Sequence, residues 1–171
     1  MKKIIIENIR KIIKARKELE KALDIKIENH DKEINLEGSP EDEYIAEKII
    51  EAMEIGFSAQ KALLIKTEDF FYENLNIKHY TKRKDLKRIR ARIIGANGKT
   101  LRLLTELTDC FFEIKENNIG IIGPPENVKN AHDAIILIIQ GSKQANVYAF
   151  LEKHRVKPVL DLGLKEPKKK K

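Results

Sequence analysis

The chain contains 171 residues, which is enough for one medium domain or two small ones. Hydrophobic residues make up 42% of it, so it can bury a core and a wholly disordered chain is excluded, while a net charge of +7 favours a polyanionic partner. The single cysteine, Cys110, excludes an internal disulfide and a cysteine-rich zinc site, and the apolar run at residues 4–6 is too short for a signal peptide or a membrane span, so we expect a cytoplasmic protein with no membrane partner.

The first half of the chain begins with a basic stretch, residues 10–19, whose pattern predicts a continuous helix. Apolar residues at 25–27 and 34–36 predict two strands. A Gly-Ser-Pro turn at residues 38–40 then precedes a long amphipathic helix that Gly56 closes as a left-handed cap. A short helix over residues 58–65 follows, and we expect a linker helix over residues 67–73.

The second half contains a basic helical pattern up to Ile94, the sequence Gly95-Ala96-Asn97-Gly98, and a further helix with leucines on one face. Residues 110–114 and 119–122 predict two strands joined by an asparagine turn. Pro124 and Pro125 are typical of a helix start, Gly141 of a helix end, and residues 144–154 predict a final helix.

The two halves repeat one pattern at a constant offset. Residues 34–41 correspond to residues 119–126, and the register continues without a gap, so that Ala46 falls on Ala131 and Gly56 on Gly141. A register that persists through strand, turn, helix and cap indicates two similar modules in tandem. The sequence therefore predicts an α+β protein built from two similar modules in tandem.

A four-residue glycine loop, Gly95-Ala96-Asn97-Gly98, joins two helical patterns in the second module. Glycines adopt backbone angles closed to other residues and have no Cβ, so a sugar-phosphate backbone can approach closely. The amides that begin the next helix favour an anion, and Lys99 follows at once. Residues 80–104 contain nine lysines or arginines against one acid, whereas residues 28–54 contain ten acids against two lysines. This distribution favours a phosphate-binding site in the second module, although the basic residues 10–17 leave weak phosphate contact by the first module open.

The stretch Ile94-Gly95-Ala96-Asn97-Gly98 resembles the signature of KH domains, and the order of elements around it resembles the type I (eukaryotic-type) module. Several stretches resemble more narrowly the archaeal KH proteins related to the eukaryotic small-subunit assembly factor Partner of NOB: residues 86–89, 92–95, 97–100 and 121–126, and Gly56-Phe57-Ser58 followed by Lys61-Ala62-Leu63. The first module departs from the pattern, because no glycine occurs before Gly38 and the loop positions project onto residues 10–13.

This resemblance implies two tandem type I modules, each packing a three-stranded antiparallel sheet against helices. Together with the repeat, it divides the chain into a degenerate KH module without the glycine loop (residues 1–66), the linker helix (67–73) and a KH module with the loop (74–157). The resemblance excludes the lysine-rich end of the chain, whose charge predicts a basic disordered tail over residues 158–171. It implies binding of single-stranded RNA, namely small-subunit rRNA near its 3′ end, during ribosome maturation. The implied protein partners are a NOB-type endonuclease, an rRNA dimethyltransferase and the α subunit of translation initiation factor two. The expected RNA-binding residues are Arg88, Arg92, Ile93, Ile94, Gly95, Ala96, Asn97, Gly98, Lys99 and Thr100.

Two other functions compete with this interpretation. Gly98-Lys99-Thr100 mimics the end of a nucleotide-binding P-loop, but that motif needs a glycine at position 93, which is isoleucine, and a strand before the loop. A protein-interaction scaffold that kept the fold and binds RNA only weakly is the stronger alternative, because the first module lacks its loop. No residue pattern predicts an enzyme, a cofactor or a metal site.

Overall fold

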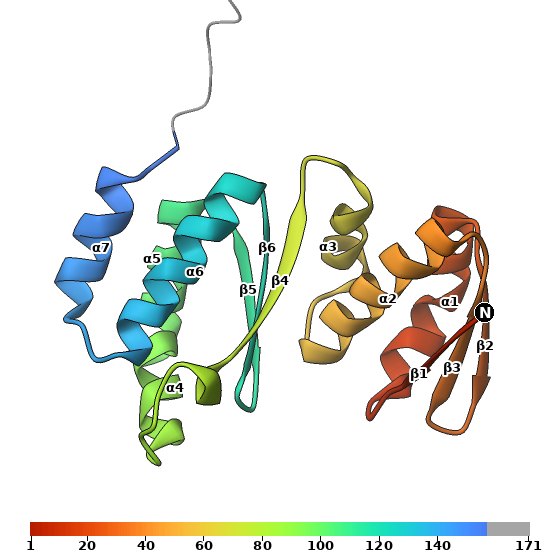
Figure 1. The fold of residues 1–171 in the computed structure, drawn as a ribbon, viewed down its shortest axis with the longest axis horizontal. Helices are drawn as coiled ribbons and strands as arrows, with labels where there is room; N and C mark the ends of the chain where they lie inside the picture. Colours follow the sequence, from red (N-terminus) through yellow and green to blue (C-terminus); the bar gives the residue numbers. More distant parts are fainter. Residues whose placement is uncertain (157–171) are drawn as a thin grey trace, which may run out of the picture.

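The computed structural model describes residues 1–156, which form an α+β fold with two three-stranded antiparallel sheets (Figure 1). The predicted tail, residues 158–171, lies outside the described residues. We call residues 1–66 the first half and residues 71–156 the second half. The elements of the first half are β1 (Lys2–Ile5), α1 (Ile9–Leu23), β2 (Lys26–His30), β3 (Glu33–Glu37), α2 (Pro40–Ile55), α3 (Ala59–Leu63) and the 3-10 helix η1 (Leu64–Lys66).

The second half carries additional helical elements between its first strand and its long helices. Its elements are β4 (Phe71–Asn76), η2 (Ile77–His79), α4 (Leu86–Ile94), η3 (Ala96–Gly98), α5 (Lys99–Thr108), β5 (Phe111–Lys115), β6 (Asn118–Gly123), α6 (Pro125–Ile139) and α7 (Gln144–Lys153). In both halves the last strand in sequence lies in the middle of the sheet, with the orders β1-β3-β2 and β4-β6-β5.

The two sheets share the same register, which extends the repeat seen in the sequence. Ile27 pairs with Leu36 as Phe112 pairs with Ile121, and both pairs are related by the offset that relates residue 34 to residue 119. Backbone angles repeat as well: Asp24 and Asp109, which follow α1 and α5, have φ values of 53° and 52°. The repeat is therefore one of strand pairing and backbone conformation as well as of residue type.

The first strand of each half follows a shorter offset. Ile4 pairs with Ile34 as Leu75 pairs with Ile119, so β1 corresponds to β4. The second half is therefore longer than the first between its first strand and its next long helix, and this is where α4 and the glycine loop lie. The first half lacks their counterpart, and α1 runs through the loop positions as continuous helix, as the sequence predicts.

The predicted linker helix over residues 67–73 is wrong. The 3-10 helix η1 ends at Lys66, a turn follows, and Phe71 already begins strand β4. Tyr72 pairs with Ile122 of β6, and Leu75 pairs with Ile119. Strand pairing with residues far along the chain overrides the local helical pattern. A window of neighbouring residues does not reveal this pairing.

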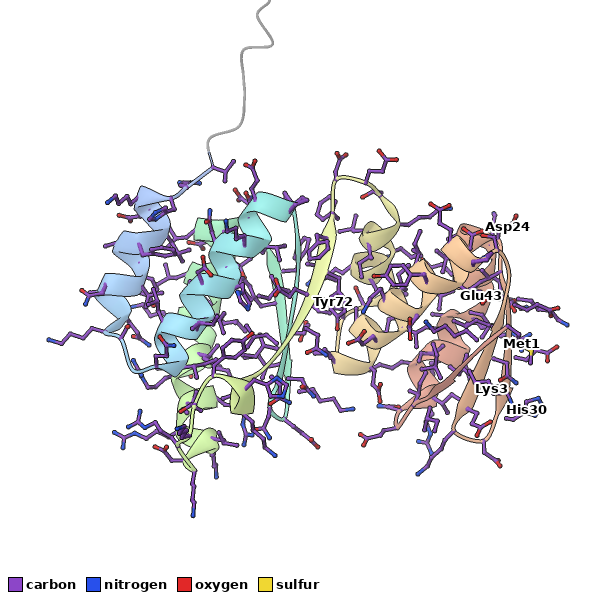
Figure 2. All side chains as sticks on the ribbon, viewed as in Figure 1. Met1, Lys3, Asp24, His30, Glu43 and Tyr72 are labelled. Atoms are coloured by element: carbon purple, nitrogen blue, oxygen red, sulfur yellow. The ribbon has the colours of Figure 1, made fainter. Side chains whose placement is uncertain are left out.

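Helix α2 of the first half covers the outer face of the second sheet, and Lys61 of α3 lies over the ring of Phe111 on β5 (Figure 1). Tyr72 and Ile122 belong to the same buried cluster as Phe57, and Tyr72 lies at the seam between the halves (Figure 2). Gly120 is required at this seam, because a Cβ there would lie 2.7 Å from Cε2 of Phe57. The corresponding face of the first sheet carries exposed side chains in the described chain, among them Lys3 and His30 (Figure 2).

Among residues 1–156, no helix combines the length and the apolar character that crossing a bilayer requires.

Candidate nucleic-acid interface

The glycine loop turns the chain sharply between α4 and α5. Three of its four residues have positive φ: Gly95 (76°), Asn97 (53°) and Gly98 (73°). Asn97 is one of the few residue types that adopt this conformation readily. A hydrogen bond from the amide of Gly98 to the carbonyl of Gly95, 3.2 Å long, closes the turn. The loop therefore presents a compact, backbone-rich surface.

The two glycines serve different purposes. A Cβ on Gly95 would lie 2.7 Å from the amide nitrogen of Thr100 and would overlap its hydroxyl, so Gly95 is required for the packing of the loop. A Cβ on Gly98 would meet no atom within 4 Å. The absence of a side chain at Gly98 leaves space over the start of α5, where a ligand backbone can approach.

We expect alanine at Gly95 to reduce the free energy of unfolding by about 2–4 kcal/mol, because it combines overpacking with a backbone conformation that is nearly exclusive to glycine. Alanine at Gly98 should cost only about 1–2 kcal/mol, the strain of a left-handed residue. Urea unfolding of both variants, followed by circular dichroism, measures the difference. Equal losses would contradict the separate roles of the two glycines.

The start of α5 is suited to an anion. Its first backbone amides have no intrahelical acceptor, and the dipole of this ten-residue helix adds partial positive charge at Lys99. Lys99 is exposed, and Arg102, one turn further, donates to the carbonyl of Asn97 at 3.2 Å. Arg102 thus braces the loop and adds charge beside it; the sequence interpretation counted this arginine but gave it no role.

The arginines of α4 differ in their surroundings: some side chains are exposed, and others form hydrogen bonds within the protein. Arg92 donates to the carbonyls of Ile138 (3.1 Å) and Ser142 (2.6 Å), which ties α4 to the end of α6. Arg88 is exposed, as is Lys87. We therefore expect Arg88 to face a ligand and Arg92, predicted to contact RNA, to position α4 instead.

Two other predicted RNA-binding residues are buried. Ile93 is completely buried in the core of the second half, whereas its neighbour Ile94 is 37% exposed. Thr100 is 3% exposed, and its hydroxyl accepts a hydrogen bond of 3.0 Å from Nε2 of Gln144. Gln144 also donates to the carbonyl of Arg92, so this side chain, which no sequence signal singled out, links α7 to both helices around the loop.

The structure thus brings together a subset of the predicted residues at one exposed site. Gly95, Ala96, Asn97, Gly98 and Lys99 form the loop and the first residue of α5, with Ile94 and Arg88 on the adjoining helix. Ile93, Thr100 and Arg92 lie beneath this site and hold it in shape.

The nucleotide-binding alternative is not supported by the loop's surroundings. A P-loop follows a strand, whereas helix α4 precedes this loop directly. Within residues 1–156, no group of three or more histidine, cysteine, aspartate or glutamate side chains is arranged to hold a metal ion.

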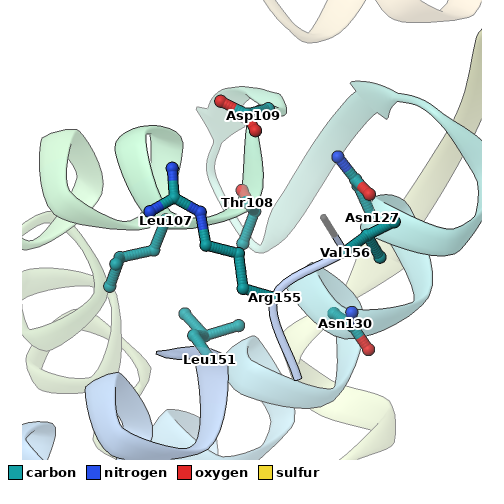
Figure 3. Close-up of a pocket in the computed structure, with 8 residues that line it drawn as sticks. All are labelled: Leu107, Thr108, Asp109, Asn127, Asn130, Leu151, Arg155 and Val156. Carbon is teal, nitrogen blue, oxygen red and sulfur yellow. The ribbon is translucent and has the colours of Figure 1, made fainter. Parts of the chain in front are cut away.

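Neither Cys110 nor the hollow near it offers a reactive site. Cys110 is buried, as expected for a small core residue, and burial raises the pKa of its thiol to about 11, so it stays protonated at neutral pH. The hollow between α5, α6 and α7, bordered by Leu107, Asn130 and Arg155, encloses only about 10 Å³, too little for a small-molecule ligand (Figure 3).

Comparisons with known proteins agree with this geometry. A family model of the second KH domain of PNO1, described as a eukaryotic type KH-domain (KH-domain type I), matches residues 71–156. The KH domain-containing protein MJ0443 of Methanocaldococcus jannaschii is 28% identical over 150 residues, which cover 84% of this chain and 66% of that protein. The RNA-binding protein pno-1 of Caenorhabditis elegans is 29% identical over 62% of this chain and 40% of its own length. The chain therefore spans less than two thirds of these relatives.

Two solved structures from Pyrococcus horikoshii show the same fold. The crystal structure of Dim2p is 27% identical, covers 89% of this chain and 98% of its own, and superposes with a TM-score of 0.82. The second is that of the a/eIF2alpha-aDim2p-rRNA complex, in which the matching chain is 26% identical and also has a TM-score of 0.82, with 90% of this chain and 93% of that chain covered.

Proposed function

Since the chain belongs to the family of type I KH domains, as a relative of PNO1 and Dim2p, we propose that it binds single-stranded RNA through the glycine loop and acts, without catalysis, in maturation of the small ribosomal subunit. A KH loop grips the sugar-phosphate backbone of about four nucleotides. The observation that carries the proposal is the open space over Gly98 at the start of α5, flanked by the exposed Lys99.

In this proposal the backbone of the RNA crosses the loop, the amides of α5 and Lys99 contact phosphates, and Arg88 extends the positive surface along α4. Ile94 offers an exposed apolar side chain to a base. Ile93, Thr100 and Arg92 support the site from below, which refines the residue set expected from the sequence.

The RNA we propose is small-subunit rRNA near its 3′ end, bound in the cytoplasm. The Pyrococcus relative was solved in a complex with a/eIF2alpha and rRNA, which supports the α subunit of translation initiation factor two as a partner here. A NOB-type endonuclease and an rRNA dimethyltransferase complete the proposed set on the strength of the resemblance to Partner of NOB.

We further propose that the first half is a degenerate KH module. Its sheet has the strand order and register of the second sheet, and it lacks only the segment that supplies α4 and the glycine loop. RNA binding then belongs to the second half, and residues 1–66 serve orientation or protein contact.

Binding to short single-stranded RNA over a range of salt concentrations tests the proposal. We expect log Kd to rise linearly with log salt concentration, and Lys99→Ala to reduce the slope by about 0.7–1, the value of one phosphate contact. Fluorescence anisotropy with a labelled oligonucleotide measures both. Lys3→Ala, an exposed lysine on the first sheet, is the matched control and should leave the slope unchanged. Absence of RNA binding at low salt would overturn the proposal.

A further inference from the structure

A groove opens on the first half between α1 and the junction of α2 and α3; we call it the α1 groove. It encloses about 440 Å³ and is lined by Lys11, Lys14, Ala15, Glu18, Met53, Gly56, Phe57, Ser58 and Ala59. Its floor is apolar, formed by Ala15, Met53, Phe57 and Ala59, while Lys11, Lys14 and Glu18 stand exposed at its rim.

The repeat identifies what occupies the same place in the second half. At the offset that relates residue 34 to residue 119, the floor residues Ala15, Met53, Phe57 and Ala59 correspond to Thr100, Ile138, Ser142 and Gln144. Three of those residues form hydrogen bonds with helix α4, and the fourth, Thr100, is bonded to one of the three. Arg92 of α4 donates to the carbonyls of Ile138 and Ser142, and Gln144 donates to the carbonyl of Arg92 and to Thr100. The α1 groove therefore corresponds to the surface on which α4 packs in the second half, and we call that surface the α4 seat.

The groove is uncovered because the first half lacks the segment that contains α4. The residues at corresponding positions also differ in polarity. Alanine stands in the first half where the second has Thr100 and Gln144, and phenylalanine stands where it has Ser142. The hydrogen bonds that the Gln144 side chain makes to Arg92 and Thr100 therefore have no counterpart in the first half, where alanines take both positions. Ala15 and Ala59 are partly exposed in the groove, and Met53 and Phe57 lie buried beneath them. An apolar groove with a charged rim is typical of a site that receives the apolar face of a helix.

We propose that the α1 groove binds a short amphipathic helix of a partner protein, in the place that α4 takes in the second half, and that this helix is acidic on the sides that meet Lys11 and Lys14. The nine-residue α4 sets the length that the seat accommodates, and its buried Ile89 and Ile93 set the spacing of the apolar side chains. Within residues 1–156, neither rim lysine forms an ion pair, so both are available to carboxylates.

The other occupants fit the groove less well. Single-stranded RNA would match the lysines, but this part of the chain has no glycine loop, and the floor is shaped as the seat of a helix. The chain's own last seven residues include five lysines and would be repelled by the rim. In a second copy, α4 is already packed in its own seat by Arg92.

The test is a titration of the ¹⁵N-labelled chain with two synthetic helical peptides that keep the apolar spacing of α4. One carries glutamate at every outward position and the other carries lysine. We expect the acidic peptide to shift the amide signals of Ala15, Phe57 and Ala59 with a saturable curve, and the basic peptide to leave them unchanged. Lys11→Glu with Lys14→Glu should weaken the acidic peptide about ten-fold, from the loss of two rim ion pairs. Ala59→Arg, which places a long side chain in the groove, should abolish its binding.

Lys3→Glu with Lys32→Glu changes the net charge equally on residues away from the groove and should bind the acidic peptide as the unmodified chain does. The proposal is overturned if the acidic peptide fails to bind, if the control pair weakens it as much as the rim pair does, or if the shifts lie elsewhere. It is also overturned if a short RNA shifts these amide signals, or if the signals shift with protein concentration, as self-association would make them do. A shift of the same signals in a variant that ends at Val156 would show that the tail occupies the groove, and this would overturn the proposal as well. Because RNA binding by the glycine loop is measured separately, failure of either proposal leaves the other standing.

Discussion

Replacing Ala96 and Asn97 together by aspartate should weaken RNA binding by about a hundred-fold or more, because two negative charges then face the phosphates at the start of α5. Both side chains lie at the surface of the loop, and both glycines of the loop stay in place. Aspartate also tolerates the left-handed conformation of residue 97, so the stability should change by less than about 0.5 kcal/mol. Fluorescence anisotropy gives the affinity, and urea unfolding shows that the fold persists.

The neutral variant Ala96→Asn is the matched control, since it has nearly the size of aspartate without the charge, and it should bind RNA within a few-fold of the unmodified chain. Placing aspartate at Gly95 instead would confuse loss of binding with loss of structure, because any side chain there meets Thr100. If the loop variant bound RNA normally while charge reversal at Lys14 and Arg16 abolished binding, the RNA site would lie on the first half.

Phe57→Ala should be the most destabilising of these changes, reducing the free energy of unfolding by about 3–5 kcal/mol. The ring is 1% exposed and lies against Gly120, so its removal leaves a cavity at the seam between the halves. Urea unfolding of the full chain measures the loss. Phe71→Ala, at an aromatic residue that is 52% exposed, is the control and should cost less than about 1 kcal/mol.

A double-mutant cycle tests whether the ring acts through Gly120. Gly120→Ala alone places a Cβ 2.7 Å from the ring and should cost about 1–3 kcal/mol by overpacking. In the Phe57→Ala background the same change has space and should cost much less. Additive losses would show that the two residues do not share the seam.

Features carried by local pattern were predictable. The repeat from residue 34 to residue 56 relies on apolar spacing, a proline start and a glycine end, which act within a few residues of one another. The strand register confirms its first part, residues 34–37. The glycine loop was equally visible, since positive φ at Gly95 and Gly98 needs no distant partner to be inferred. Burial of Cys110 followed from its residue type.

Features set by distant packing were not predictable. Residues 71–73 form a strand because β6 lies beside them. The Arg92 side chain hydrogen-bonds to Ile138 because the ends of α4 and α6 lie close together in space. Ile93 and Ile94 are adjacent and identical in type, yet one is buried and the other is 37% exposed. Only the direction in which α4 packs on α6 separates them, and a single sequence does not contain it.

The interlocking of Phe57 with Gly120 has a consequence for how the chain meets its partners. Phe57 of the first half and Tyr72 and Ile122 of the second sheet share one buried cluster, which joins the half that contains α1 to the half that contains the glycine loop. An RNA strand gripped at the loop would therefore hold any protein docked on the first half at a set distance and angle from it. The chain would hold its two ligands close to each other, so that binding of the first raises the effective concentration of the second.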